Sequence, residues 1–118
     1  MLGQVGEAEL GPEDQKIVTL ARATRVRVGS VEGAAVRDET GRTYAAATVA
    51  LPSLHLSALA LAVAMAVSSG AGALEAAALV SDGSGPSQAD LAAVRDIGAK
   101  AVVIHATPDG TIRQTIRP

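Results

Sequence analysis

The chain has 118 residues, of which 48% are apolar, with 10 basic and 12 acidic side chains, no Cys and a single aromatic residue, Tyr44. A chain of this length can support one core without disulfides or a structural metal. The lack of Cys excludes a disulfide scaffold, a Cys-based zinc site, a thiol nucleophile and an iron–sulfur centre. A formal net charge of −2 and the scarcity of aromatic rings for base stacking argue against nucleic-acid binding.

The chain carries no pattern of a targeting or membrane segment. Residues 1–10 contain Glu7 and Glu9 where a secretory signal would have basic and then apolar residues. Residues 49–74 are uncharged, but Pro, Ser, His and Gly leave only 58–67 as an uninterrupted apolar run, which is typical of a buried core helix. Arg outnumbers Lys eight to two, as GC-rich coding produces. We therefore expect a bacterial cytoplasmic protein without membrane contact.

The first half of the chain predicts a helix, a hairpin and a second helix. We expect residues 1–11 to be a flexible arm and 12–118 a single domain, which opens with an amphipathic helix from Pro12 to about Arg25. Short strands at 33–37 and 43–49 flank a hairpin turn. The next helix runs from Ser53 as N-cap to Val67. It is apolar on every face, so it should be covered on all sides.

The second half predicts a strand at 75–80, a loop at 81–86, a helix at 87–97 closed by Gly98, a buried strand at 101–104 and a last strand at 111–115. The order is α-β-β-α-β-α-β-β. Strands alternating with helices in the middle of the chain imply right-handed parallel crossovers. The predicted class is therefore a layered α/β sheet with helices on its faces and a hairpin at one edge.

Three stretches together resemble the cytidine deaminase family. They are Val31-Glu32-Gly33-Ala34-Ala35-Val36, the hairpin Glu39-Thr40-Gly41-Arg42, and the helix from Ser57 to Ser68-Ser69-Gly70. The resemblance extends from about residue 13 to 106 and rests on the order and spacing of the elements. It implies a cytidine deaminase-like fold and a homo-oligomer, either a dimer or a tetramer.

The resemblance also implies a zinc site that this chain has lost. In the family, one His or Cys on the apolar helix and two Cys of a Pro-Cys-x-x-Cys motif hold zinc, and a Glu moves protons. The first ligand position falls on Ser57 and the Glu position on Leu59. The motif falls on residues 86–90, where Pro86 matches but Ser87 and Asp90 replace the two Cys. Serine is a poor zinc ligand and Leu59 cannot carry a proton, so we expect no metal, no cofactor and no deamination.

Two further comparisons support the same prediction. In an alternative alignment, a second register, His55-Leu56-Ser57 corresponds to the His-x-Glu of the family. His55 is then the zinc ligand and Ser57 takes the place of the Glu, but the cysteines are still absent. The ribose-binding Asn-x-Glu of the family falls on Thr48-Val49-Ala50, and Ala50 cannot accept hydroxyl hydrogen bonds. The remnant pocket consists of the family's site positions, which here are Thr48, Ala50, Ser57, Leu59, Ser87 and Asp90.

Other chemistry in the sequence is sparse. Gly83-Ser84-Gly85 lacks a third glycine and a P-loop Lys, so it reads as a plain loop. Asp82 and Asp90 flank that loop, where Asp90 fits a first-turn helix acid, and His105 and Asp109 bracket a turn. Three hypotheses remain: an inactive structural or interaction module, with an unknown protein partner if it has one; a nucleoside-like binding protein using the remnant pocket; and, least favoured, a hydrolase with different chemistry.

Overall fold

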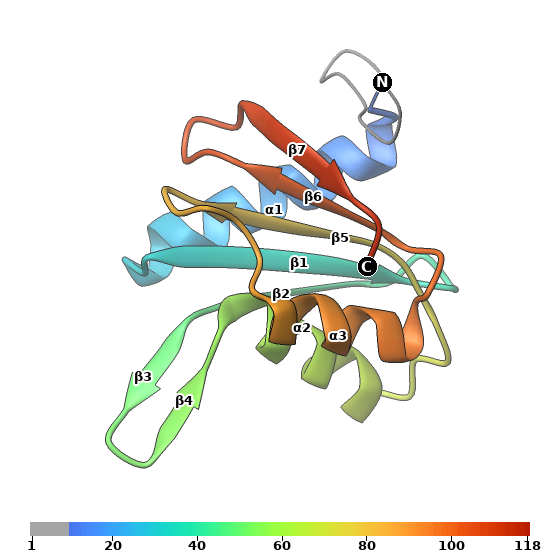
Figure 1. Ribbon diagram of the computed structural model, residues 1–118, viewed down its shortest axis with the longest axis horizontal. Helices are drawn as coiled ribbons and strands as arrows, with labels where there is room; N and C mark the ends of the chain where they lie inside the picture. The colour runs from blue at the N-terminus through green and yellow to red at the C-terminus, as the bar shows by residue number, and fades with distance from the viewer. Residues whose placement is uncertain (1–9) are drawn as a thin grey trace.

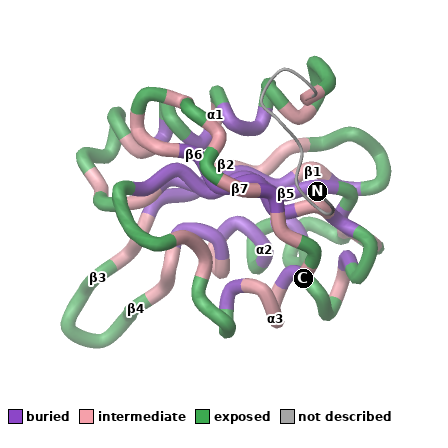
Figure 2. Tube along the Cα trace, turned by 45° about the horizontal axis from the view of Figure 1, so that its top comes forward, coloured by how far each residue is buried: buried purple, intermediate pink, exposed green. Residues whose placement is uncertain are grey.

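The computed structural model describes residues 10–118 (Figure 1). In chain order the elements are α1 (Pro12–Val28), β1 (Glu32–Asp38), β2 (Thr43–Ala47), β3 (Val49–Leu51), β4 (Leu54–Leu56), α2 (Ala58–Ser68), β5 (Leu74–Ser81), α3 (Gln88–Ile97), β6 (Val102–Ala106) and β7 (Ile112–Ile116). Helix α1 covers one face of the sheet, and α2 and α3 cover the other, as Figure 2 shows. This arrangement confirms the predicted layered α/β class. The predicted arm falls almost wholly on residues 1–9, which lie outside the described part of the chain.

The main sheet has five strands in the order β2-β1-β5-β6-β7. Strand β1 is antiparallel to both β2 and β5, whereas β5 and β6 are parallel and β6 and β7 are antiparallel. Because β2 and β5 both oppose β1, they run in the same direction. The connection through α2 from β2 to β5 and the connection through α3 from β5 to β6 therefore each join strands of the same direction, as predicted. Only β5 and β6 are neighbours in the sheet, because β1 lies between β2 and β5.

Helix α1 runs three residues beyond its predicted end at Arg25. Pro12 occupies its first turn together with Glu13 and Asp14, and the arginines of its last turn complement the helix dipole. The helix ends where Gly29 adopts a left-handed conformation, with φ 72°, and its N–H bonds back to the last turn. Glycine supplies this stop at little steric cost.

The predicted start of the apolar helix at Ser53 is wrong. The N-cap is Ser57, whose Oγ accepts a hydrogen bond from the Ala60 N–H at 3.1 Å. Residues 54–56 instead form β4, which pairs with β3 in a separate hairpin. The predicted strand at 43–49 is consequently divided at Thr48 between β2 and β3. This extra hairpin projects beyond the main sheet (Figure 1).

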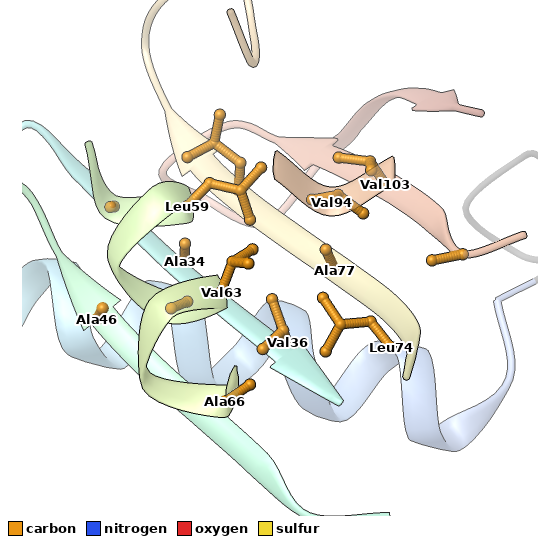
Figure 3. Packing of buried hydrophobic residues seen from close by; sticks show 14 residues of the cluster. Ala34, Val36, Ala46, Leu59, Val63, Ala66, Leu74, Ala77, Val94 and Val103 are labelled. Atoms are coloured by element: carbon orange, nitrogen blue, oxygen red, sulfur yellow. The ribbon is translucent and has the colours of Figure 1, made fainter. Parts of the chain in front are cut away.

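The core has one apolar layer on each side of the sheet. On the α2 side, Leu59 and Val63 point from the helix toward Ala34, Val36 and Ala77 of the sheet (Figure 3). On the other side, α1 contributes Ile17, Val18 and Ala21 to a cluster with small residues of β1, β5 and β6. The many alanines allow the helices to approach the sheet closely.

The expectation that α2 is covered on all sides is wrong for the isolated chain. Its inner face is buried, but Met65 is 37% exposed and Val67 is 51% exposed. The sheet packs against only one side of this helix, so the opposite side stays open in the isolated chain. In residues 10–118, no helix is both long enough and apolar enough to cross a membrane.

Candidate functional site

The structure brings together Ser57, Ser87 and Asp90, three of the six predicted remnant-pocket residues. They lie at the first turns of α2 and α3, whose N-cap residues are Ser57 and Ser87. Ser57 Oγ donates a hydrogen bond to Asp90 Oδ1 at 2.6 Å, which joins the two helices. That length is typical of a hydroxyl bound to an ionised carboxylate. We call these three residues the Ser57–Asp90 cluster.

Asp90 also completes a capping box at the start of α3. Its backbone N–H donates to Ser87 Oγ at 3.0 Å, and its Oδ2 accepts from the Ser87 N–H at 3.2 Å. This confirms Asp90 as a first-turn acid of the helix. The residue is 4% exposed, and both oxygens of its side chain have partners, as a buried carboxylate requires. One residue therefore caps α3 and holds α2 against it.

The Ser57–Asp90 cluster does not fit a zinc ion. It offers two hydroxyls and one carboxylate, whereas protein zinc sites use Cys, His and carboxylate ligands in sets rich in nitrogen and sulfur. Its oxygens are also engaged with one another and with the helix N–H groups at 2.6–3.2 Å. Within residues 10–118, no group of three or more His, Asp or Glu side chains is placed to hold a metal.

Leu59 lies one position beyond the first residue of α2 and is fully buried in the core. Its side chain packs with Val63 against the sheet (Figure 3). A buried hydrocarbon side chain provides no group that could accept or donate a proton. Leu59, which the resemblance places at the Glu position, therefore packs in the core.

Thr48 and Ala50 belong to a different environment. Thr48 Oγ1 donates to Glu32 Oε1 at 3.4 Å, and Ala50 is exposed in β3 opposite His55 of β4. No hydrogen bond found in the described part of the chain links either residue to the Ser57–Asp90 cluster. His55 is exposed and lies in β4 of the hairpin, apart from the helix that carries Ser57 and Leu59.

The remaining carboxylate candidates have structural partners. Asp82 is exposed and lies 3.8 Å from Arg25 in an ion pair. Asp109 accepts hydrogen bonds from the Thr107 hydroxyl and the Thr111 N–H, which lower its pKa to about 2. The predicted turn role of Asp109 is therefore confirmed.

Sequence reasoning missed a buried polar pair on neighbouring strands. Ser81 Oγ of β5 lies 3.1 Å from His105 Nε2 of β6, and the two residues are 3% and 1% exposed. Burial of the ring, with a smaller effect of Arg113, lowers the pKa of His105, whereas the backbone of Ser81 raises it. The sequence predicts Ser81 in the loop after the strand, but it is the last residue of β5. Its position on the same sheet face as His105 becomes visible only with the β5–β6 register.

The fold defines a layered α/β protein with two helices that begin side by side on one sheet face. A family model described as "Cytidine deaminase-like" matches residues 10–110. The chain therefore belongs to the cytidine deaminase-like family. No curated protein matches the sequence directly.

Solved structures of cytidine deaminases share the fold. The enzyme from Burkholderia pseudomallei is 21% identical with a TM-score of 0.73, over 84% of this chain and 88% of that one. Cytidine deaminase from Mycobacterium leprae is 20% identical with a TM-score of 0.63, over 84% of this chain and 90% of that one. The Mycobacterium tuberculosis enzyme is 22% identical with a TM-score of 0.62, over 81% and 88%. At such identities the likeness concerns the fold.

Proposed function

We propose that this protein is a catalytically inactive member of the cytidine deaminase-like family that acts as a structural or interaction module in the cytoplasm. The observation that carries the proposal is the Ser57–Asp90 hydrogen bond of 2.6 Å. Under the correspondence drawn from the sequence, these residues stand at two of the three zinc-ligand positions. A direct bond between them closes the space in which a metal would sit.

The proposal also accounts for the other family positions. Leu59 fills the core where a proton carrier would stand, and Ala50 cannot accept a hydrogen bond through its side chain. Loss of a general base alone lowers a rate by about two to four orders of magnitude. Loss of the metal removes the activated water as well.

We propose that the module forms a homo-oligomer through the outer face of α2 and the β3–β4 hairpin. The uncharged segment 49–74 contributes Met65 and Val67 from the helix, and Leu51 and Leu54 of the hairpin are 55% and 49% exposed. A groove of about 370 Å³ runs along the helix, lined by Leu61, Ala64, Met65, Ser68 and Ser69. Such an apolar surface without charges suits a second copy of itself better than a charged partner.

Restoring thiols tests the site correspondence. We expect the variant Ser57→Cys/Ser87→Cys/Asp90→Cys to bind one zinc ion per subunit, because the three positions converge and thiolates are strong zinc ligands. Leu59 is left unchanged, since a buried carboxylate there would destabilise the core. A matched control, Thr19→Cys/Ser53→Cys/Ser68→Cys, has as many thiols at exposed positions on α1, on the β3–β4 hairpin and at the end of α2, and leaves the Ser57–Asp90 cluster intact. Equal zinc uptake by both folded variants would overturn the correspondence.

Oligomer formation is tested by light scattering after gel filtration. We expect the unmodified chain to elute as a dimer or tetramer, and Met65→Glu/Val67→Glu to elute as a monomer, because the interface would have to bury two charges. Thr19→Glu, at an exposed position of α1 on the other side of the sheet, serves as the control. A monomeric unmodified chain would contradict the proposed interface. A rise in melting temperature with cytidine would instead favour a nucleoside-like binding protein.

A further inference from the structure

The chain contains two Asp-Gly pairs, Asp82-Gly83 and Asp109-Gly110, and no Asn. An aspartate followed by glycine is prone to isomerise, because no side chain hinders attack by the glycine nitrogen on the aspartate carboxyl group. The other aspartates of the chain precede larger residues. By this local criterion the two pairs are equivalent, so a difference in their reactivity has to come from the fold.

Asp82-Gly83 lies at the exposed start of the loop between β5 and α3. The Asp82 side chain is 82% exposed and pairs with Arg25 at 3.8 Å, and such a surface ion pair restrains a carboxylate little. In the described part of the chain, no hydrogen bond of the Gly83 N–H is found. A Cβ on Gly83 would have only Ser81 Oγ within 4 Å, at 3.8 Å, so the backbone is uncrowded. Both reacting groups are therefore free to approach each other.

In Asp109-Gly110 both reacting groups are held by the turn. The Asp109 carboxylate accepts hydrogen bonds from the Thr107 hydroxyl and, at 2.9 Å, from the Thr111 N–H. The Gly110 N–H donates to the Thr107 carbonyl oxygen at 2.8 Å. The bonds from Thr107 and Thr111 also lower the pKa of Asp109 to about 2, so the protonated carboxyl group that the reaction requires is scarce there. Attack at this pair first has to break the turn.

We propose that Asp82 is a site of spontaneous conversion to isoaspartate in the folded protein, and that Asp109 is protected from the same reaction. The Gly83 nitrogen attacks Cγ of the protonated Asp82 carboxyl group and forms a C–N bond, while the carboxyl OH and the amide proton leave as water. The product is a cyclic succinimide. Water then adds to one of its two carbonyl carbons. Breaking the bond between the nitrogen and the backbone carbonyl carbon gives isoaspartate, and breaking the bond to Cγ restores aspartate.

The modification lengthens the loop that leads into α3. In isoaspartate the chain continues through the side-chain carbon, so the backbone gains an extra atom and the free carboxylate sits next to the backbone. The loop ends at Ser87, the N-cap of α3. The proposal does not depend on the inactivity of the remnant pocket, because neither reacting group belongs to the Ser57–Asp90 cluster.

The test is incubation of the folded full chain for several weeks at neutral pH. Samples are then digested with endoproteinase Asp-N, which cleaves before aspartate but not before isoaspartate, and electron-transfer dissociation assigns the modified positions. We expect isoaspartate to form at position 82 about tenfold faster than at position 109, or more. A tenfold ratio corresponds to about 1.4 kcal/mol, the size of one hydrogen bond. Cleavage before the buried Asp90 serves as the internal reference and should not change.

Two variants and an unfolded sample separate the effect of the fold from that of the local sequence. Gly83→Ala places a Cβ beside the attacking nitrogen without a clash and should slow the reaction at position 82. Thr107→Ala removes a hydrogen bond of Asp109 and should speed the reaction at position 109. In guanidinium chloride the two pairs should react at similar rates. Absence of isoaspartate at position 82, equal rates at both positions in the folded chain, or the same ratio of rates in folded and unfolded samples would each overturn the proposal.

Discussion

The hydrogen bond between Ser57 and Asp90 should contribute measurably to folding stability. Asp90→Ala removes the acceptor of this bond and half of the capping box of α3, two contacts of a buried carboxylate. Hydrogen bonds to charged groups contribute about 1.5–3 kcal/mol and a helix cap about 1 kcal/mol. We therefore expect Asp90→Ala to lower the free energy of unfolding by about 3 kcal/mol. Ser57→Ala removes the same bond and the cap of α2, for about 2.5 kcal/mol.

A double-mutant cycle isolates the bond itself. Because each single variant already lacks it, the double variant should be more stable than the sum of the single effects predicts, by about 1.5 kcal/mol. Urea unfolding followed by circular dichroism at one protein concentration measures the four stabilities. A control cycle pairs Ser57→Ala with Thr19→Ala, which lies in α1 on the other face of the sheet. The effects of these two substitutions on the free energy of unfolding should be additive. A coupling energy below about 0.5 kcal/mol between positions 57 and 90 would refute the link.

Three other substitutions probe the fold. Gly33→Ala should lower stability by about 3 kcal/mol or more in urea unfolding, because its Cβ would lie 2.1 Å from the backbone oxygen of Ala21; an unchanged midpoint would refute this contact. Leu59→Ala should cost about 3 kcal/mol by the same measurement, since the side chain is fully buried; a loss below about 1 kcal/mol would contradict its core role. Burial disfavours the Asp38 carboxylate, but hydrogen bonds from Thr40, Tyr44 and the backbone outweigh burial and lower its pKa from 3.8 to about 2. The folded pKa is below the unfolded one, so this stabilisation is present above pH 3.8 and is lost as the pH falls toward 2; Asp38→Asn should flatten that acid loss in pH-dependent melting curves, and an unchanged slope would refute it.

The elements with strong local signals were predictable. Pro12 with two following acids marked the start of α1, and Ser87 with Asp90 three positions on marked the start of α3. The start of α2 could not be predicted from the sequence, because both Ser53 and Ser57 are suitable N-cap residues. The strand at 54–56 is too short to show alternation, and it exists through pairing with β3, a contact that local propensity does not encode.

The candidate site was predictable only in part. The family resemblance selected Ser57, Ser87 and Asp90, and the fold brings them together. The bond between Ser57 and Asp90 joins residues 33 positions apart, so no local pattern signals it. The same limit applies to Ser81 and His105, whose contact depends on the register of two parallel strands.

Native mass spectrometry after incubation with zinc and desalting tests the central claim most directly. The account predicts a dimer or tetramer of the 11.8 kDa chain without bound zinc, because the Ser57–Asp90 cluster uses its oxygens internally. One zinc ion retained per subunit, or a monomer at all concentrations tested, would contradict it.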